Sequence, residues 1–325
     1  MISLVTVAVV GLVGWAVTLA EEPAGRTPAE TAGGWVKDPK SPVLGRDLGT
    51  CFDVSVLADG PGYRMWFSWR PKKSIALVES KDGVAWSTPK IVLGPNEKTD
   101  WEADLNRPVV LKVGGQYRMW YTGQAKGRSW IGSATSPDGV TWTRDTAKPE
   151  LSADQPWEKV AVMCPHVLYD AGTKTYRMWY SGGDQHEPNA IGYATSADGV
   201  KWAKHTDKPV FKPDPARPWE RDRVTACQVV RRGDWHVMFY IGFRDVSHAQ
   251  VGLARSRDGI TGWERHPANP VIRPGAGTWD QDAVYKPYAV FDGKRWLLWY
   301  NGRKGGVEQI GLAAHDGEDL SFSPR

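Results

Sequence analysis

Carboxylates that directly follow a tryptophan recur four times along the chain, and they are the residues best suited to chemistry. Three of the four segments carry a second acid two residues further on. The segments are Trp101-Glu102-Ala103-Asp104, Trp157-Glu158-Lys159-Val160, Trp219-Glu220-Arg221-Asp222 and Trp279-Asp280-Gln281-Asp282. A carboxyl group can donate or accept a proton, and an indole ring can stack on another ring. Such a set suits a ligand rich in hydroxyl groups, such as a sugar.

The two acids of each segment invite different interpretations. The first acid is present in every copy, and a residue that every copy carries usually serves every copy. We therefore interpret Glu102, Glu158, Glu220 and Asp280 as structural. The second acids are the candidates for proton transfer or substrate binding: Asp104, Asp222 and Asp282.

A further set of candidates lies where five internal repeats disagree. Alignment of the first residues of the predicted inner strands gives Asp53, Arg107, Cys164, Ala226 and Lys286. Disagreement is expected where a repeated scaffold builds an asymmetric site. Asp53 is the only acid of the five, so we predict a catalytic carboxylate there, with Asp222 or Asp104 as its general acid.

Basic and aromatic residues complete the candidate site. Four cations could hold an anionic group such as a uronate or sulfate, or could pair with nearby acids: Arg107, Lys286, Arg244 and Arg303. Trp69 and Trp130 are candidates for stacking. His166 could bind substrate or a metal, or could be a hydrogen-bonded core residue. The loop that carries Trp130 has a counterpart in the third repeat with Asp184, His186 and Glu187.

The elements that must position these residues follow from a repeated Tyr-Arg-Met-Trp motif. Full copies end at Trp66, Trp120 and Trp179, and degraded copies end at Phe239 and Trp299, spaced 54, 59, 60 and 60 residues apart. Each unit continues with an Ile-Gly-x-Ala-like segment, an Asp-Gly turn and another Trp. This pattern predicts four short strands per unit, and a repeat of this kind is typical of a β-propeller. We predict an all-β fold of five blades with four antiparallel strands each.

The last repeat lacks its outer strand, and the N-terminal part of the domain supplies a candidate. In the complete copies Trp142, Trp202 and Trp263 each precede a proline by seven residues. Trp35 precedes Pro42 by the same interval. We therefore expect residues 35–44 to complete the last blade, which would leave the sheet without free edges.

The sequence outside the repeats bears on location and partners. Residues 1–20 carry no charge and predict a signal peptide or an uncleaved anchor, residues 21–33 a flexible linker, and residues 34–325 a single propeller domain. We expect a secreted or periplasmic protein with no membrane contact unless that segment is retained. The formal net charge of +4 is too small to indicate nucleic-acid binding.

The three cysteines, Cys51, Cys164 and Cys227, show no metal-binding spacing. A bridge between Cys164 and Cys227 and three buried free thiols both remain open.

The repeats, the segment Asp53-Val54-Ser55-Val56 and the turns from Ala134 to Trp142 and from Ala194 to Trp202 resemble the five-bladed glycoside hydrolase superfamily. That group includes the arabinanases and xylosidases of family 43, invertases and levansucrases, and the mannoside phosphorylases of family 130. The resemblance covers residues 34–320. It implies hydrolysis of an oligosaccharide or polysaccharide, without a required cofactor, although some relatives carry a metal such as calcium in the central channel.

The resemblance implies a catalytic set that this chain matches only in part. Family-43-like members use a first-blade Asp as general base, a third-blade Asp that tunes a pKa and a fourth-blade Glu as general acid. Asp53 matches the first position. The third-blade position reads Cys164-Pro165, and the fourth-blade stretch around Ala226 contains no Glu.

Two other functions therefore compete with hydrolysis. A non-catalytic carbohydrate-binding propeller would explain the missing acid. A phosphorylase would use the cations for phosphate, which export to a phosphate-poor compartment disfavours. Sialidases are disfavoured because they need six blades.

Overall fold

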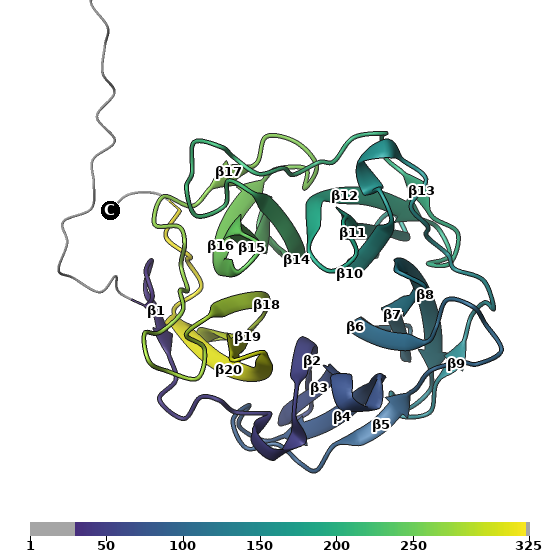
Figure 1. The fold of residues 1–325 in the computed structure, drawn as a ribbon, viewed down its shortest axis with the longest axis horizontal. Coiled ribbons are helices and arrows are strands. Elements are labelled where there is room, and N and C mark those ends of the chain that lie inside the picture. Colours follow the sequence, from purple (N-terminus) through teal and green to yellow (C-terminus); the bar gives the residue numbers. More distant parts are fainter. Residues whose placement is uncertain (1–29, 323–325) are drawn as a thin grey trace, which may run out of the picture.

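The computed structural model describes residues 30–322, and these form twenty strands with three short 3-10 helices. The strands are grouped into four-stranded antiparallel meanders arranged around a central axis (Figure 1). This confirms the predicted all-β propeller. The helices are η1 (Arg46–Leu48), η2 (Arg70–Lys72) and η3 (Pro156–Glu158).

We number the meanders as blades 1 to 5 in chain order. Blade 1 contains β2 (Cys51–Asp59), β3 (Gly62–Trp69), β4 (Ser74–Ser80) and β5 (Lys90–Leu93). Blade 2 contains β6 (Asp104–Val113), β7 (Gln116–Ala125), β8 (Arg128–Ser136) and β9 (Thr143–Arg144), and blade 3 contains β10 (Ala161–Asp170), β11 (Thr175–Gly183), β12 (Pro188–Ser196) and β13 (Ala203–Lys204). One parallel pair, Ala161 with Ser129, joins blades 2 and 3 into one sheet.

The remaining two blades contain the end of the chain. Blade 4 contains β14 (Arg223–Arg232), β15 (Trp235–Asp245), β16 (His248–Ser256) and β17 (Glu264–Arg265). Blade 5 contains β18 (Ala283–Phe291), β19 (Arg295–Lys304) and β20 (Val307–Asp316), with β1 (Trp35–Lys37) paired antiparallel to β20. The predicted segment 35–44 therefore supplies the fourth strand of this sheet, but the strand is shorter than predicted: it covers residues 35–37, with a separate bridge between Leu44 and Ile310.

The Tyr-Arg-Met-Trp anchors connect neighbouring blades. The indole N–H groups of Trp66, Trp120 and Trp179 donate to the turn glycine carbonyls of the following blade at 3.0, 2.8 and 2.8 Å. Trp299 of blade 5 donates in the same way to Gly83 of blade 1 at 2.9 Å, which links the last blade to the first. A Cβ on Gly83 would lie 2.7 Å from the Trp299 ring, so a glycine is required at this contact.

The turn aspartates have the structural role that their repetition indicates. In blade 2, Asp138 Oδ1 accepts hydrogen bonds from the N–H groups of Val140 and Thr141 at 2.8 and 2.7 Å. Asp82, Asp198 and Asp258 make the same pair of bonds in their own turns. These residues fix the turns and do not face the channel.

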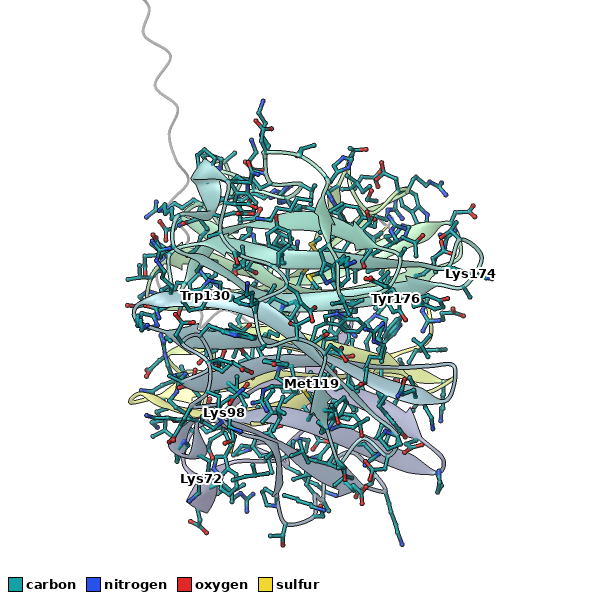
Figure 2. All side chains as sticks on the ribbon, turned by 90° about the vertical axis from the view of Figure 1, so that its right-hand side faces the viewer. Lys72, Lys98, Met119, Trp130, Lys174 and Tyr176 are labelled. Carbon is teal, nitrogen blue, oxygen red and sulfur yellow. The ribbon has the colours of Figure 1, made fainter. Side chains whose placement is uncertain are left out.

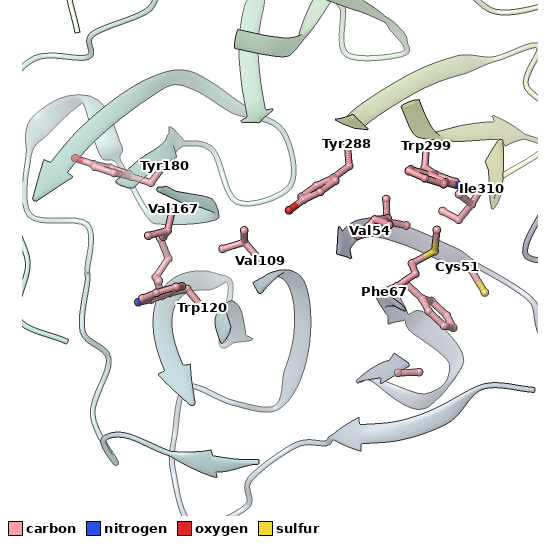
Figure 3. Packing of buried hydrophobic residues seen from close by; sticks show 14 of the residues in the cluster. Cys51, Val54, Phe67, Val109, Trp120, Val167, Tyr180, Tyr288, Trp299 and Ile310 are labelled. Atoms are coloured by element: carbon pink, nitrogen blue, oxygen red, sulfur yellow. The ribbon is translucent and has the colours of Figure 1, made fainter. Parts of the chain in front are cut away.

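The inner strands bring apolar residues together at the centre. Val54, Val109 and Val167 of blades 1 to 3 belong to one buried cluster with Tyr288 of blade 5 (Figure 3). Cys51, Cys164 and Cys227 are buried free thiols, and burial raises the pKa of Cys51 and of Cys227 to about 12. Of the two states left open by the sequence, the structure has the free thiols.

The structure describes little of the two N-terminal segments that the sequence predicts, the signal peptide or anchor and the linker. Residues 1–20, predicted as a signal peptide or anchor, lie outside the described residues, as does most of the predicted linker. Within residues 30–322, no helix has the length and apolar character needed to cross a membrane.

Candidate active site

A cavity of about 310 Å³ opens on the face that carries the loops between the second and third strands. In the side view this face bears Lys72 and Trp130, and the opposite face bears Lys174 (Figure 2). The cavity is lined by residues of all five blades: Phe52, Asp53, Arg70, Asp104, Arg107, Gln124, Ala125, Lys126, Cys164, Gln185, His186, Glu187, Pro188, Thr225, Ala226, Ile241, Tyr285 and Glu308.

The five aligned inner-strand residues share a strained backbone conformation beside this cavity. Their φ angles are all positive, from 42° to 56°, and each lies at an interruption of the ladder between the first two strands. The residues are Asp53, Arg107, Cys164, Ala226 and Lys286. Such left-handed conformations are unfavourable for residues with a Cβ and cluster at functional sites. The predicted alignment therefore identifies a real structural ring.

Side chains of the preceding blade stabilise four members of this ring. The N–H of Arg107 donates to Ser68 Oγ at 2.7 Å, and that of Ala226 donates to Ser181 Oγ at 2.8 Å. The N–H of Cys164 donates to Thr122 Oγ1, and the N–H of Asp53 donates to Asn301 Oδ1. The repeated scaffold thus fixes the backbone while the side chains vary.

Asp53 is held by residues of two neighbouring blades. It is 4% exposed, and its Oδ1 accepts a hydrogen bond from Asn301 Nδ2 at 2.7 Å. Its Oδ2 lies 3.1 Å from Arg107 Nε. The amide and the guanidinium each engage one oxygen of the carboxylate and restrict its orientation.

Glu187 has the opposite environment. It lies just before β12 in the loop of blade 3, lines the cavity and makes no side-chain hydrogen bond or ion pair with residues 30–322. Burial raises its pKa to about 7, helped by the negative charges of Asp53 and Glu308 and opposed by Arg107 and Arg303. A cavity carboxyl with such a pKa is protonated over much of the neutral range and can act as an acid.

Glu308 is a third carboxylate of the cavity, but each of its two oxygens already has a partner. Arg70 Nη2 lies 3.0 Å from its Oε2, and the Tyr285 hydroxyl donates to its Oε1. Burial, followed by the Glu308 charge, raises the pKa of Tyr285, so this phenol stays protonated. The Arg70 guanidinium also lies over the Phe52 ring at 4.2 Å, which covers that ring against sugar stacking.

The structure separates the three predicted second acids. Asp104 lines the cavity and accepts a hydrogen bond from Asn106 at 3.2 Å. Asp222 is outside the cavity lining, with its side chain 36% exposed and paired with Arg223 Nε at 2.6 Å. Asp282 is also outside the lining and accepts from the N–H of Gly305 at 2.7 Å.

The four predicted cations do not converge on one point. Only Arg107 lines the cavity. Lys286 is 3% exposed, and it lies near the thiols of Cys164 and Cys227. The other two point to loop groups: Arg244 to Asp245 at 3.2 Å, and Arg303 to the Ser247 carbonyl at 2.9 Å.

His166 and the two candidate stacking residues also have other partners. His166 is 4% exposed with Nε2 2.7 Å from the Val229 carbonyl, so this nitrogen donates its hydrogen. Burial lowers its pKa to about 3, and the ring is neutral. Trp69 donates from Nε1 to the Leu48 carbonyl at 2.9 Å, and neither Trp69 nor Trp130 lines the cavity.

The side chains that most often bind metals do not cluster in the described part of the chain. Calcium needs six to eight oxygen ligands. Between residues 30 and 322 no group of three or more His, Cys, Asp or Glu could hold a metal.

The first acids of the Trp-acid segments form a repeated structural network, as we interpreted them. Glu102 accepts from the Tyr121 hydroxyl at 2.8 Å and from Arg144 Nε at 2.7 Å. Glu158 and Glu220 pair with a tyrosine and an outer-strand cation in the same way. In blade 5 the cation is Lys37 of β1, 2.7 Å from Asp280, so β1 takes the place of an outer strand in this network too.

Comparison with known proteins adds the family. The model of the family described as glycosyl hydrolases family 43 matches residues 40–314. The chain belongs to this family. Two uncharacterized proteins of Mycobacterium tuberculosis, MT1551 of strain CDC 1551 / Oshkosh and Rv1502 of strain ATCC 25618 / H37Rv, are each 30% identical over 219 residues, covering 63% of this chain and 69% of the relative.

Solved structures of glycoside hydrolases share the fold. A structure described as a glycoside hydrolase has a TM-score of 0.71 at 19% identity, covering 84% of this chain and 89% of its own. A thermostable family-43 glycoside hydrolase has a TM-score of 0.69 at 16% identity, covering 88% and 97%. A third structure, from work on GH130 glycoside hydrolases that target beta-1,2 mannosidic linkages in Candida mannan, has a TM-score of 0.66 at 16% identity, covering 91% and 99%. Membership and fold together identify a glycoside hydrolase.

The main residue that the sequence did not single out is Glu187. It was visible as an acid in the loop between the second and third strands of blade 3, beside Asp184 and His186. Asp184 is bound to Lys159 at 2.9 Å, and His186 is exposed. Only the three-dimensional surroundings distinguish Glu187 from these neighbours.

Proposed function

We propose that this family-43 protein hydrolyses glycosidic bonds with Asp53 as general base and Glu187 as general acid. The observation that carries the proposal is the contrast between two carboxyls of one cavity. Asp53 is bound by Arg107 and Asn301, whereas the Glu187 side chain has no hydrogen-bond or ion-pair partner among the described residues and a pKa raised to about 7. Two carboxyls in opposite protonation states are what glycosidic hydrolysis requires.

In an inverting displacement the two groups act on opposite faces of the sugar. Glu187 gives its proton to the glycosidic oxygen as the bond from that oxygen to the anomeric carbon breaks. Asp53 takes a proton from a water molecule, whose oxygen forms the new bond to the anomeric carbon. Arg107 and Asn301 orient the Asp53 carboxylate toward that water. Glu187 replaces the fourth-blade acid that the family resemblance leads one to expect, since Ala226 occupies that region.

The charges of the cavity favour a neutral sugar over the anionic one considered from the sequence. Each lining cation already has a carboxylate partner: Arg107 with Asp53, Arg70 with Glu308 at 3.0 Å, and Lys126 with Asp100 at 3.6 Å. Two further lining acids, Asp104 and Glu187, have no cation within 4.0 Å among the described residues. With Glu187 protonated as the general acid, a uronate or sulfate would find no unpaired lining cation and would meet the negative charge of Asp104.

The setting of the enzyme follows from the N-terminal segment. The uncharged residues 1–20 support export, so the proposal places the protein outside the cytoplasm, acting on an oligosaccharide or polysaccharide.

A carbohydrate-binding propeller without catalysis is the second candidate. It is favoured by one observation: Cys164 and Ala226 stand where the family's catalytic positions carry acids. This function requires that Glu187 take no part in catalysis.

The test is a screen of the purified protein against neutral and acidic glycans and their aryl glycosides, with released reducing ends as the readout. Asp53→Asn is compared with Asp59→Asn, which changes the same side chain at the opposite end of β2, where it forms a pair with Arg64 at 3.8 Å. We expect hydrolysis that is lost only in Asp53→Asn. Binding by calorimetry without any release would establish the binding propeller, and release that needs phosphate would establish a phosphorylase.

A further inference from the structure

One guanidinium influences both of the proposed catalytic carboxyls. Arg107 Nε lies 3.1 Å from Asp53 Oδ2, and Arg107 lines the same cavity as Glu187. Burial is the main cause that raises the pKa of Glu187 to about 7, and the charge of Arg107 is the largest influence that opposes it. The position of Arg107 therefore affects the base through a direct contact and the acid through its charge.

The other side of the guanidinium is held by Asn106. Arg107 Nη1 donates to Asn106 Oδ1 at 2.6 Å, and Asn106 is 1% exposed. Asn106 Nδ2 donates to Gln124 Oε1 at 2.8 Å and to Asp104 Oδ1 at 3.2 Å. Gln124 Nε2 donates in turn to Ser129 Oγ at 2.8 Å. The network thus crosses β6, β7 and β8 of blade 2, where Asp104 pairs with Gln124 and Gln124 with Ser129.

This network has one consistent direction of donation. A guanidinium has no acceptor, so the Asn106 atom that faces Arg107 must be the amide oxygen. The amide nitrogen then faces Gln124 and Asp104, which both offer oxygens. A reversed Asn106 amide would place two donors together at Arg107 and two acceptors together at Gln124. The bonds therefore fix Asn106 in the orientation that binds Arg107.

The network separates Arg107 from two carboxyls that lack a cation. Asp104 and Glu187 line the cavity, and neither has a cation within 4.0 Å among the described residues. A free guanidinium would be attracted to either of them. Asn106 engages Arg107 with its oxygen and Asp104 with its nitrogen, which leaves Asp53 as the carboxylate that pairs with Arg107.

We propose that Asn106 is a positioning residue that holds Arg107 on Asp53 and away from Glu187, so that the two carboxyls keep their separate roles. This inference rests on the proposed function and adds a residue that lies one hydrogen bond beyond the catalytic pair. The amide is specific to blade 2, because the residues that precede the ring position in the other blades are Phe52, Met163, Thr225 and Tyr285.

The acidity of Glu187 reports where Arg107 lies. The charged groups that influence Glu187 come from β2, β6, β19 and β20, namely Asp53, Arg107, Arg303 and Glu308, and the cavity lining adds Arg70, Asp104, Lys126 and His186. Asn106→Ala removes none of these groups. A lower pKa of Glu187 in this variant would therefore report a cation that has moved toward it.

The titration of Glu187 can be followed without a substrate. Protein labelled with ¹³C at the glutamate carboxyl carbons would be titrated by NMR, and the resonance that is missing in Glu187→Gln would be assigned to Glu187. We expect a midpoint near pH 7 in the wild type and about one pH unit lower in Asn106→Ala, because an adjacent guanidinium lowers a carboxyl pKa by about 1–3 units. Asn106→Thr should give the same shift. Threonine is suited to a strand and lacks the amide, so this variant covers a failure of Asn106→Ala to fold.

The matched control is Asn301→Ala, which removes the other side-chain partner of Asp53 and leaves the Arg107 network intact. Its Glu187 midpoint should stay near pH 7. An unchanged midpoint in the folded Asn106 variants, or an equal shift in Asn301→Ala, would overturn the inference.

Kinetics separate this inference from the proposed function. With a glycoside that the wild type hydrolyses, Asn106→Ala should lower kcat about tenfold, and the decline of kcat/KM should begin about one pH unit lower. A loss of kcat without the shift would reduce Asn106 to a structural role. If the wild type hydrolysed no glycan or aryl glycoside, the proposed function would be overturned, while the titration would still decide whether Asn106 places Arg107.

Discussion

Two glutamates of this protein have nearly the same acidity and very different surroundings. Burial is the main cause that raises the pKa of Glu187 and of Glu150 to about 7 in both cases. Glu187 lines the cavity. Glu150 lies between β9 and the start of blade 3, outside the cavity, and its Oε2 is buried without a hydrogen-bond partner among the described residues.

The hydrogen bonds around Glu150 show where its proton is used. The Ser133 hydroxyl lies 2.5 Å from Asp145 Oδ2 and 2.6 Å from Glu150 Oε1. A hydroxyl has one hydrogen to donate, so one of these contacts requires a protonated carboxyl. The raised pKa of Glu150 assigns that proton to Glu150, which donates to Ser133, while Ser133 donates to Asp145. Glu150, Ser133 and Asp145 all lie outside the cavity lining.

The comparison shows that a raised pKa by itself reports only that a carboxyl is buried. A carboxyl that acts on a substrate must also be accessible from a cavity. At the position of Glu150 three other repeats carry valine, namely Val43, Val210 and Val271. Glu150 is thus a polar residue placed in an apolar position, and its acidity is a consequence of that placement. Glu187 has the same acidity at a cavity that also contains a second carboxylate, Asp53, which is paired with Arg107.

The largest expected difference between the two sites is in catalysis. Glu187→Gln should lower kcat by about 10²–10⁴-fold, because the general acid is lost, and Glu150→Gln should leave it within about twofold. Glycosides with good leaving groups need no acid, so their hydrolysis by Glu187→Gln should fall much less. Equal losses in both variants, or no loss in Glu187→Gln, would contradict the assignment.

The pH dependence gives the next effect. Glu187 must be protonated, so kcat/KM should fall about tenfold per pH unit above a midpoint near pH 7. The residual activity of Glu187→Gln should lack this decline, whereas Glu150→Gln should keep it. If the decline disappeared in Glu150→Gln, the titrating acid would be Glu150 and the assignment of Glu187 as general acid would be wrong.

The sequence predicts the scaffold well because the scaffold is repeated. The Trp anchors, the Asp-Gly turns and the structural acids can be identified since each copy supports the others. The pairing of β1 with β20 follows from one spacing, the seven residues between Trp35 and Pro42. Asp53 can be found because it breaks the pattern at a position that all five copies share.

The sequence does not predict the acid, because its properties arise from residues far apart in the chain. The pKa of Glu187 depends on Asp53, Arg107, Arg303 and Glu308, which come from blades 1, 2 and 5. The direction of the Asp222 side chain depends on its neighbour Arg223, which no spacing reveals. Repetition therefore predicts the fold and the place of the site, but not the protonation states within it.

The free energy of unfolding should respond to the two glutamates in the opposite order, with the larger effect at Glu150. The pKa of Glu150 is higher in the folded protein, about 7, than its ordinary value of 4.5, so the unfolded chain loses this proton first. The contribution of Glu150 to folding stability therefore declines as pH rises from about 4.5 to about 7 and then stays low. Glu150→Gln should remove this decline and gain about 1–2 kcal/mol over wild type between pH 5 and pH 8.

The free energy of unfolding, measured in urea at pH 5 and at pH 8, tests this effect. Glu187→Gln serves as the matched variant, and it should gain less because its carboxyl is partly exposed to water. A gain for Glu150→Gln that is independent of pH would show that Glu150 does not titrate in the folded protein.

The smallest expected effect tests Asp222, one of the two acids that the sequence offered as the general acid. Asp222 is partly exposed, pairs with Arg223 and lies outside the cavity lining, so it does not contact a sugar bound in the cavity. Asp222→Asn should therefore change kcat by less than about fivefold and should keep the decline above pH 7. If instead Asp222→Asn lost about 100-fold or more while Glu187→Gln did not, the loop of blade 4 would supply the acid, and the cavity contrast between Asp53 and Glu187 would have no catalytic meaning.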